Sequence, residues 1–254
     1  MKKMVCLLVI LIILTTNFFT ITSVYKLYNM MENKSNLEKE NASERKLDVD
    51  STWLGKENPT VVLMGSSVTW GYGASSLEKS WTGLLKGYFL DTNPDINYIN
   101  LAVSGFKTTD VLNISVPIAA NLTPDVIIIE NCLINDFSNM YTTSQSSQNI
   151  DNIISKLKND HPNSKIYIMP PNIIVDKNFK NSEGLIYYEY VTQVGDYLKT
   201  KGYNYIDFWN EYESLLDSQG LSLEQSLNQD QIHPNDIGYE IWFNSIKKYF
   251  TLNS

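Results

Sequence analysis

Short apolar runs alternate with longer segments of helical periodicity from residue 60 onwards. The apolar runs have the length of buried strands and cover 60–64, 97–100, 126–130, 165–169 and 203–207. Between and after them, apolar positions recur at helical spacing over 77–89, 108–120, 150–159, 183–201 and 236–249. This alternation predicts an α/β domain, in which a central parallel sheet carries helices on both faces.

Small polar residues follow three successive predicted strands. The first strand runs into VVLMGSSVTWGYG, where Ser67 is the second of two adjacent serines. The loop after the second strand contains Gly105, and the loop after the third contains Asn131 and Asn135. Each loop alone has the composition of an ordinary turn. Because ligands bind beyond the carboxyl ends of parallel strands, the coincidence of the three loops at one edge indicates a functional site.

The N-terminal segment has a different composition from the predicted domain. Two lysines precede an apolar run that extends to residue 24, and a bilayer span needs about 20 such residues. Residues 1–24 therefore predict an uncleaved signal anchor or a cleaved signal peptide, with the rest of the chain outside the cytoplasm. Residues 25–58 are rich in Lys, Glu, Asn and Ser and predict a polar tether. Residues 59–254 then form a single domain.

Charge and cysteine content narrow the function classes. The net charge is -8 and no basic cluster occurs, so we expect no nucleic-acid partner. Of the two cysteines, Cys6 lies in the apolar segment and Cys132 in the domain, which argues against an intramolecular disulfide.

The two histidines differ in their predicted positions. His161 ends the helix before the fourth strand, at the opposite end of the sheet from Ser67, where a histidine suits the helix carbonyls. His233 precedes the last helix, in NQDQIHPNDIGY, and Asp230 lies three residues before it. In a tight turn that carboxylate can accept the Nδ1 proton and leave Nε2 to take a proton from a serine. A helix-capping cluster is the alternative interpretation of the same residues.

Taken together, VVLMGSSVTWGYG, the Gly105 loop, the Asn-Asp pair after the third strand and DQIHP resemble the GDSL or SGNH hydrolase family. The resemblance implies a flavodoxin-like three-layer α/β/α fold that cleaves esters or thioesters, with no metal and no cofactor. By position, it makes Ser67 the nucleophile, His233 the general base and Asp230 the residue that orients His233. The implied oxyanion hole consists of the N–H groups of Ser67 and Gly105 and the side-chain amide of Asn135.

The chain departs from the family pattern in two places. It has Gly65-Ser66-Ser67 where the family usually has Gly-Asp-Ser, so the hydrogen bonds of this loop must differ. The block that usually reads Gly-x-Asn-Asp is here 133–136, in a loop one residue longer, which makes Asn131 the alternative oxyanion donor. We interpret Cys132 in this loop as a packed thiol.

These residues predict an extracytoplasmic, membrane-anchored serine esterase that removes O-acyl groups. O-acetyl esters of cell-wall or exported polysaccharide are the expected substrates. Three aromatic residues near the nucleophile, Trp70, Tyr72 and Trp81, are candidates either for stacking on sugar rings or for the core. Two alternatives remain open: a lipid or thioester acylhydrolase of the same family, and a non-catalytic carbohydrate-binding module with this fold.

Overall fold

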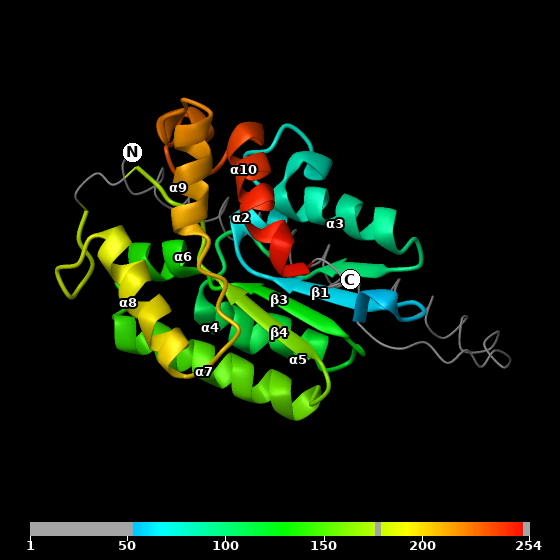
Figure 1. Cartoon of the computed structure of the whole chain (residues 1–254). Coiled ribbons are helices and arrows are strands. Elements are labelled where there is room, and N and C mark those ends of the chain that lie inside the picture. The colour runs from blue at the N-terminus through cyan, green and yellow to red at the C-terminus, as the bar shows by residue number, and fades with distance from the viewer. Residues whose placement is uncertain (1–52, 176–178, 251–254) are drawn as a thin grey trace, which may run out of the picture. The chain divides into compact units, whose positions relative to one another are not determined.

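The computed structural model describes residues 53–175 and 179–250, all within one compact unit, Asp50–Ser254 (Figure 1). The apolar segment predicted at 1–24 and most of the predicted tether lie outside the described residues. The chain is already packed at Trp53 and Leu54, which are buried in the short turn η1 (Trp53–Gly55). The Trp53 and Phe89 rings meet edge to face, with centroids 5.2 Å apart. Packed structure therefore begins before the predicted end of the tether at residue 58.

The core of the domain is a parallel sheet with the strand order β2-β1-β3-β4. The two central strands, β1 and β3, consist almost wholly of buried apolar side chains, as expected when both faces of a sheet are covered. All four strands have the predicted bounds: β1 (Thr60–Met64), β2 (Asn97–Asn100), β3 (Val126–Glu130) and β4 (Lys165–Met169).

The fifth predicted strand, 203–207, is wrong as a full strand. The segment makes one parallel bridge to β4, between Ile168 and Tyr205. Two backbone hydrogen bonds form this bridge, from Ile168 N–H to Asn204 O and from Ile206 N–H to Ile168 O. The pairing stops there because the chain turns into the helix α9 (Trp209–Ser218). The position beside β4 matches the 2-1-3-4-5 order of flavodoxin-like sheets.

Helices cover both faces of the sheet (Figure 1). On one face lie α3 (Trp81–Thr92) and α10 (Asp236–Ile246), with α9 beside α10. On the other face lie α4 (Thr108–Asp110), α5 (Val116–Ala119), α7 (Thr143–Asp160) and α8 (Tyr187–Thr200). The remaining elements are short: α2 (Ser67–Trp70), α6 (Leu133–Ser138), η2 (Leu77–Lys79), η3 (Val111–Ser115), η4 (Glu224–Ser226) and η5 (Lys247–Phe250). The domain is therefore a three-layer α/β structure.

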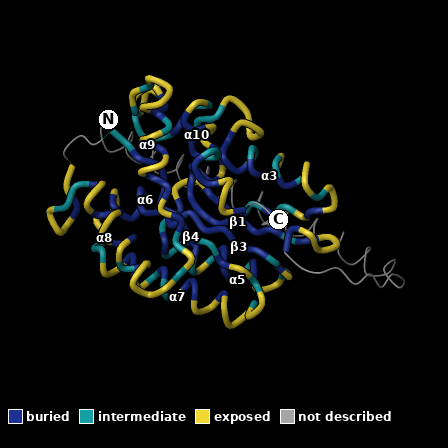
Figure 2. Tube along the Cα trace, viewed as in Figure 1, coloured by how far each residue is buried: buried dark blue, intermediate teal, exposed yellow. Residues whose placement is uncertain are grey.

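The helix α7 shows how the sequence directs this packing. Its buried apolar side chains recur three or four residues apart, so they form one stripe that faces the interior, whereas the outward positions are exposed (Figure 2). The helix begins seven residues before its predicted start at 150. Its first turn is polar but capped, because Thr142 Oγ1 accepts from Gln145 N–H and the Gln145 side chain accepts from Thr142 N–H.

The helix predicted over 108–120 is a continuous helical run with a π-type turn in its middle. At η3 the N–H of Val116 donates to Val111 O, five residues earlier. Pro117, the next residue, has no N–H to donate, which favours such an irregular turn. Within the described part of the chain, no helix is both long and apolar enough to cross a bilayer.

Candidate active site

The carboxyl end of β1 brings a serine into contact with a histidine from the last loop. Ser67 begins α2, three residues after β1, and His233 lies in the loop before α10. Ser67 Oγ and His233 Nε2 are 2.9 Å apart, although 166 residues separate them in the sequence. His233 Nδ1 and Asp230 Oδ2 are 2.6 Å apart. The structure thus places Ser67, His233 and Asp230 in one hydrogen-bonded row.

The carboxylate of Asp230 determines the orientation of the His233 ring. Its Oδ1 accepts the backbone N–H groups of Ile232 and His233, at 2.9 and 3.0 Å. Burial would raise the pKa of Asp230, but hydrogen bonds from the His233 side chain and from these two N–H groups outweigh it and lower that pKa. The ionised Asp230 accepts the Nδ1 proton, so Nε2 is left to accept the proton of Ser67 Oγ.

Asn228 ties the His233 loop to the loop that follows Ser67. Its side-chain amide donates to the carbonyl oxygens of Gly73, His233 and Pro234, at 3.1, 3.2 and 2.9 Å. Gly73 has a φ of +99°, and a Cβ there would lie 2.5 Å from Asn228 Nδ2 and from Pro234 O. A side chain at position 73 would therefore separate the two loops.

The structure shows the surroundings of the three candidate oxyanion donors, which are two backbone N–H groups and one side-chain amide. Val103 N–H donates to Gly65 O, which brings the Gly105 loop alongside the turn that carries Ser67. Among the described residues, the N–H groups of Ser67 and Gly105 donate to no protein atom. Asn135 lies on α6, half-buried, and its Nδ2 donates to Phe106 O at 2.8 Å. Because an amide NH₂ carries two protons, one remains for a ligand.

The alternative donor, Asn131, occupies a different environment. Only 2% of its surface is exposed, and neither polar atom of its side chain has a hydrogen-bond partner among the described residues. An amide enclosed in this way cannot contact a substrate unless the loop rearranges. The geometry therefore favours Asn135 over Asn131 as the residue that meets a substrate.

Ser66 stands where the family pattern usually has aspartate, and it hydrogen-bonds to a carboxylate that sequence reasoning missed. Glu130, the last residue of β3, accepts hydrogen bonds from Ser66 N–H and from Ser66 Oγ, both at 2.8 Å. The carboxylate that supports the loop therefore comes from a neighbouring strand. A sequence signal did exist, because Glu130 is an acidic residue at the end of the otherwise apolar run VIIIE.

The second half of the Asn-Asp pair is structural. Asp136 is fully buried and accepts from Thr108 N–H at 3.0 Å, from Thr108 Oγ1 at 2.6 Å and from Ser146 Oγ. Burial raises its pKa, and these hydrogen bonds act in the opposite direction. Asp136 connects α6 to the first turns of α4 and α7, so it holds the helix on which Asn135 lies.

The other histidine and the cysteine lie away from this chemistry. His161 follows α7 at the amino ends of the strands, where its Nε2 donates to Ala119 O at 3.0 Å. Cys132 is fully buried, and burial followed by the nearby charge of Glu130 raises the pKa of its thiol well above the usual value. A thiol of this kind is a poor nucleophile. No group of three or more His, Cys, Asp or Glu within 53–175 and 179–250 is placed to hold a metal ion.

The three candidate aromatic residues separate into core and surface. Trp81 is fully buried and stacks on Trp242 at 5.2 Å, so it belongs to the contact between α3 and α10. Trp70 and Tyr72 are 42% and 51% exposed. The centroids of the Tyr72 and His233 rings are 4.5 Å apart. Tyr239 Oη donates to the backbone carbonyl oxygen of Tyr72 at 2.6 Å. Tyr72 is therefore an exposed aromatic surface held beside His233.

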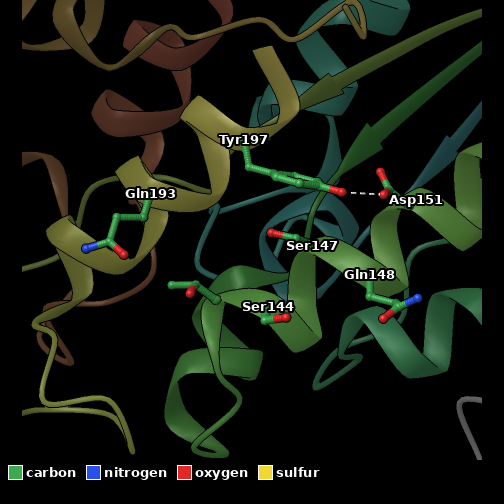
Figure 3. Close-up of a pocket in the computed structure, with 7 residues that line it drawn as sticks. Ser144, Ser147, Gln148, Asp151, Gln193 and Tyr197 are labelled. Atoms are coloured by element: carbon green, nitrogen blue, oxygen red, sulfur yellow. Dashed lines mark hydrogen bonds between the residues drawn. The ribbon is translucent and has the colours of Figure 1, made fainter. Parts of the chain in front are cut away.

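A separate hollow of about 360 Å³ lies between α7 and α8 (Figure 3). Its wall is polar, and Tyr197 Oη donates to Asp151 across it at 2.5 Å. Asp151 also pairs with Lys201. None of Ser67, His233 and Asp230 contributes to it. Its lining residues are Thr143, Ser144, Ser147, Gln148, Asp151, Gln193 and Tyr197.

Comparison with known protein families assigns the chain to one of them. Residues 63–241, more than half of the chain, match the model of the GDSL-like Lipase/Acylhydrolase family. The chain belongs to this family. It is an ester-bond hydrolase, as the family assignment shows. No curated protein sequence matches the chain.

Solved structures with the same fold include other members of the GDSL family. A GDSL-like lipase described as putative, from Parabacteroides merdae, superposes with a TM-score of 0.63 at 15% identity, over 76% of this chain and 95% of that one. The esterase EstA from a Pseudoalteromonas species superposes with a TM-score of 0.57 at 20% identity, over 76% of this chain and 99% of that one. A two-domain esterase active on acetylated mannans superposes with a TM-score of 0.59 at 15% identity, over 78% of this chain and 49% of that one. At these identities the likeness establishes the fold alone.

Proposed function

We propose that this GDSL-family hydrolase is an extracytoplasmic serine esterase that removes O-acetyl groups from cell-wall or exported polysaccharide. The observation that carries the proposal is the row formed by Ser67, His233 and Asp230, with separations of 2.9 and 2.6 Å. A serine hydroxyl is a weak nucleophile on its own, and an adjacent oriented imidazole is the group that activates it.

In the proposed mechanism, Ser67 Oγ attacks the ester carbonyl carbon while His233 Nε2 accepts its proton. The N–H groups of Ser67 and Gly105 and the Asn135 amide donate to the negative oxygen of the tetrahedral intermediate. Each such donor typically stabilises the transition state by on the order of 3 kcal/mol. His233 then protonates the leaving alcohol as the C–O bond breaks, and an acyl-enzyme forms. Water, deprotonated by His233, releases the acid and regenerates Ser67.

The position of Tyr72 supports a sugar as the leaving alcohol. His233 must deliver its proton to the leaving oxygen, so the alcohol part of the substrate lies next to the imidazole. The exposed ring of Tyr72 lies beside this imidazole, with the two ring centroids 4.5 Å apart. The face of an aromatic ring is electron-rich and attracts the C–H groups of a sugar ring. The acetylated mannans named for one neighbour are a substrate of the same chemical class.

The test is an acyl-chain profile with purified protein. We expect kcat/KM for p-nitrophenyl esters to fall by roughly tenfold or more from acetate to octanoate, since a long chain needs an extended apolar groove. Acetate release from a chemically acetylated polysaccharide should accompany this preference. A preference for octanoate would instead support the lipid acylhydrolase alternative.

Substitutions connect this activity to the proposed residues. Ser67→Ala and His233→Ala should each lower kcat by roughly 10⁴-fold or more, because the nucleophile and base act as a unit. His161→Ala is the matched control, and its kcat should stay within a few-fold of the unmodified protein. Retained turnover in Ser67→Ala would reject the serine mechanism.

A further inference from the structure

Glu130 is a buried carboxylate that the proposed mechanism does not use. Its side chain is fully buried at the end of β3, and no Lys, Arg or His pairs with it among the described residues. Burial raises its pKa, while the hydrogen bonds that it accepts act in the opposite direction. An isolated buried carboxylate is costly, so its environment must supply donors.

The two oxygens of Glu130 bind two different loops. Oε2 accepts from Ser66 N–H, Ser66 Oγ and Thr69 Oγ1, at 2.8, 2.8 and 3.1 Å. Oε1 accepts from Cys132 N–H at 2.7 Å. Gly65 leaves room for this approach, because a Cβ there would lie 2.7 Å from Oε2 and collide with Thr69 Oγ1.

Both loops carry groups of the proposed oxyanion hole. Ser66 is held at three points: its N–H and Oγ by Glu130, and its carbonyl oxygen by Trp70 N–H at 2.9 Å. These bonds fix the peptide plane between Ser66 and Ser67, and with it the direction of the Ser67 N–H. On the other side, Cys132 adopts a left-handed φ of +57° and directly precedes α6, the helix that carries Asn135.

We propose that Glu130 is a positioning residue for the oxyanion hole: its carboxylate binds the Ser66–Thr69 turn and the start of α6 together, and so holds the Ser67 N–H and the Asn135 amide in one fixed arrangement. This inference rests on the proposed serine esterase function. It explains how a chain with serine in place of the usual aspartate before the nucleophile keeps a carboxylate under that turn. An ionised carboxylate suits the position because both oxygens face a backbone N–H, which can only donate.

The direct test is Glu130→Gln in the full-length protein. Whichever way the amide is turned, its NH₂ group faces either Ser66 N–H or Cys132 N–H, and one of these donors loses its acceptor. We expect kcat on p-nitrophenyl acetate to fall by roughly 10- to 100-fold while KM stays within about threefold, since the misplaced donors act on the transition state. A kcat within threefold of the unmodified protein, or an equal effect on KM, would overturn the proposal.

A control separates positioning from general destabilisation. Ile128→Ala removes a fully buried side chain from the same strand that takes no part in the hydrogen bonds of Glu130. It should lower the Tm at least as much as Glu130→Gln does, with kcat at 25 °C within about threefold. If kcat falls in proportion to the fall in Tm in both variants, Glu130 has only a structural role.

Moving the carboxylate provides a rescue experiment. Ser66→Asp alone should lower kcat, because it places a second carboxylate against Glu130. In the Glu130→Gln background the same Ser66→Asp change should raise kcat several-fold, because the new carboxylate can accept from the glutamine amide. If Ser66→Asp changes kcat in the same direction whether residue 130 is Glu or Gln, the proposed joint action of residues 66 and 130 is contradicted.

Further variants cover the cases in which Glu130→Gln does not fold or the proposed esterase function is wrong. If Glu130→Gln does not fold, Ser66→Ala combined with Thr69→Val removes two donors to Oε2 and keeps both backbone N–H bonds. That variant should lower kcat by a few-fold with KM unchanged, and an unchanged kcat would overturn the inference. Failure of the proposed function itself is separable, because it would appear as turnover retained in Ser67→Ala.

Discussion

At the scale of single residues, Asn131 and Asn135 differ more in accessibility than in chemistry. Both are asparagines after β3, and the sequence alone leaves either one open as the oxyanion donor. The structure separates them: the Asn135 amide borders the Gly105 loop through Phe106 O, whereas the Asn131 side chain is enclosed without partners among the described residues. The same difference predicts opposite effects of the two substitutions.

Asn135→Ala should lower kcat by roughly 100-fold or more with little change in KM, because the lost donor bonds most strongly to charge that exists only in the transition state. Asn131→Ala should leave kcat within a few-fold. Steady-state kinetics on an acetyl ester, together with thermal unfolding of both variants, measure these effects. A large kcat loss for Asn131→Ala beside a near-silent Asn135→Ala would transfer the donor role to Asn131.

Sequence reasoning can anticipate contacts that depend on local spacing. Asp230 and His233 are three residues apart in one turn, so their contact follows from the chain itself. The role of Glu130 depends on the register between β3 and β1, which brings it beneath a turn 64 residues earlier. No local pattern encodes that contact. The accessibility of Asn131 was unpredictable for the same reason, since it depends on how α6 begins.

At the scale of elements, the four strands were predictable to the residue and the helices were not. The strands are apolar runs that end abruptly at polar or turn residues. Helices such as α7 begin with capped polar turns that have no apolar periodicity. The helix α9 was missed although its buried Trp209, Tyr212 and Leu216 follow helical spacing. Its sequence follows directly on the predicted fifth strand, which the structure reduces to one bridge.

The start of α10 carries a charge that stabilises the loop after Ser67. Asp236 accepts from Ser75 N–H and Ser75 Oγ, both at 2.7 Å, and from Lys79 Nζ at 2.9 Å. The Ser75 backbone bond is the largest cause that lowers the pKa of Asp236 to about 2, and Lys79 contributes to it. A carboxyl with a lowered pKa stabilises the folded state above its ordinary pKa of 3.8 and loses this effect as the pH falls towards 2.

Asp236→Asn should therefore destabilise the protein near neutral pH and much less at pH 2. Since the pair is close to the surface, the loss should be about 1 kcal/mol or less, or roughly 2–4 °C in Tm. Thermal unfolding of both proteins between pH 7 and pH 2 measures the difference, which should shrink below about pH 4. Lys248→Ala, which removes an exposed ion pair with Glu211 away from the site, is the matched control for surface charge. A difference that is constant with pH would contradict the assignment.

At the scale of the whole molecule, the limit of the catalytic unit follows from packing rather than from composition. Trp53 and Leu54 lie in a polar stretch that the sequence indicates as tether, yet both are buried, and Asn93 Nδ2 donates to Leu54 O at 2.9 Å. Composition averaged over a window cannot reveal two anchoring residues within a polar segment. The N-terminal anchor itself stays a prediction.

Fragments test where the catalytic unit begins. A fragment of residues 50–254 should be soluble and as active per mole as the full-length protein, which should sediment with membranes if residues 1–24 anchor it. A fragment of residues 59–254 lacks the buried Trp53 ring and should be less stable by roughly 3–5 kcal/mol. Ultracentrifugation, ester turnover and urea unfolding measure these outcomes. Equal stability of the two fragments would show that Trp53 contributes nothing to the domain.

The distance of 166 residues between Ser67 and His233 has a consequence for the newly made chain. At about 5–20 residues per second, a ribosome needs roughly 10 to 30 s to reach the histidine codon after the serine codon. During that interval the emerging polypeptide carries the serine, and later also Glu130, but it lacks the histidine that would accept the serine proton. Every truncated translation product that stops before Asp230 should therefore be inert towards esters, so hydrolysis by this protein reports that synthesis has passed His233.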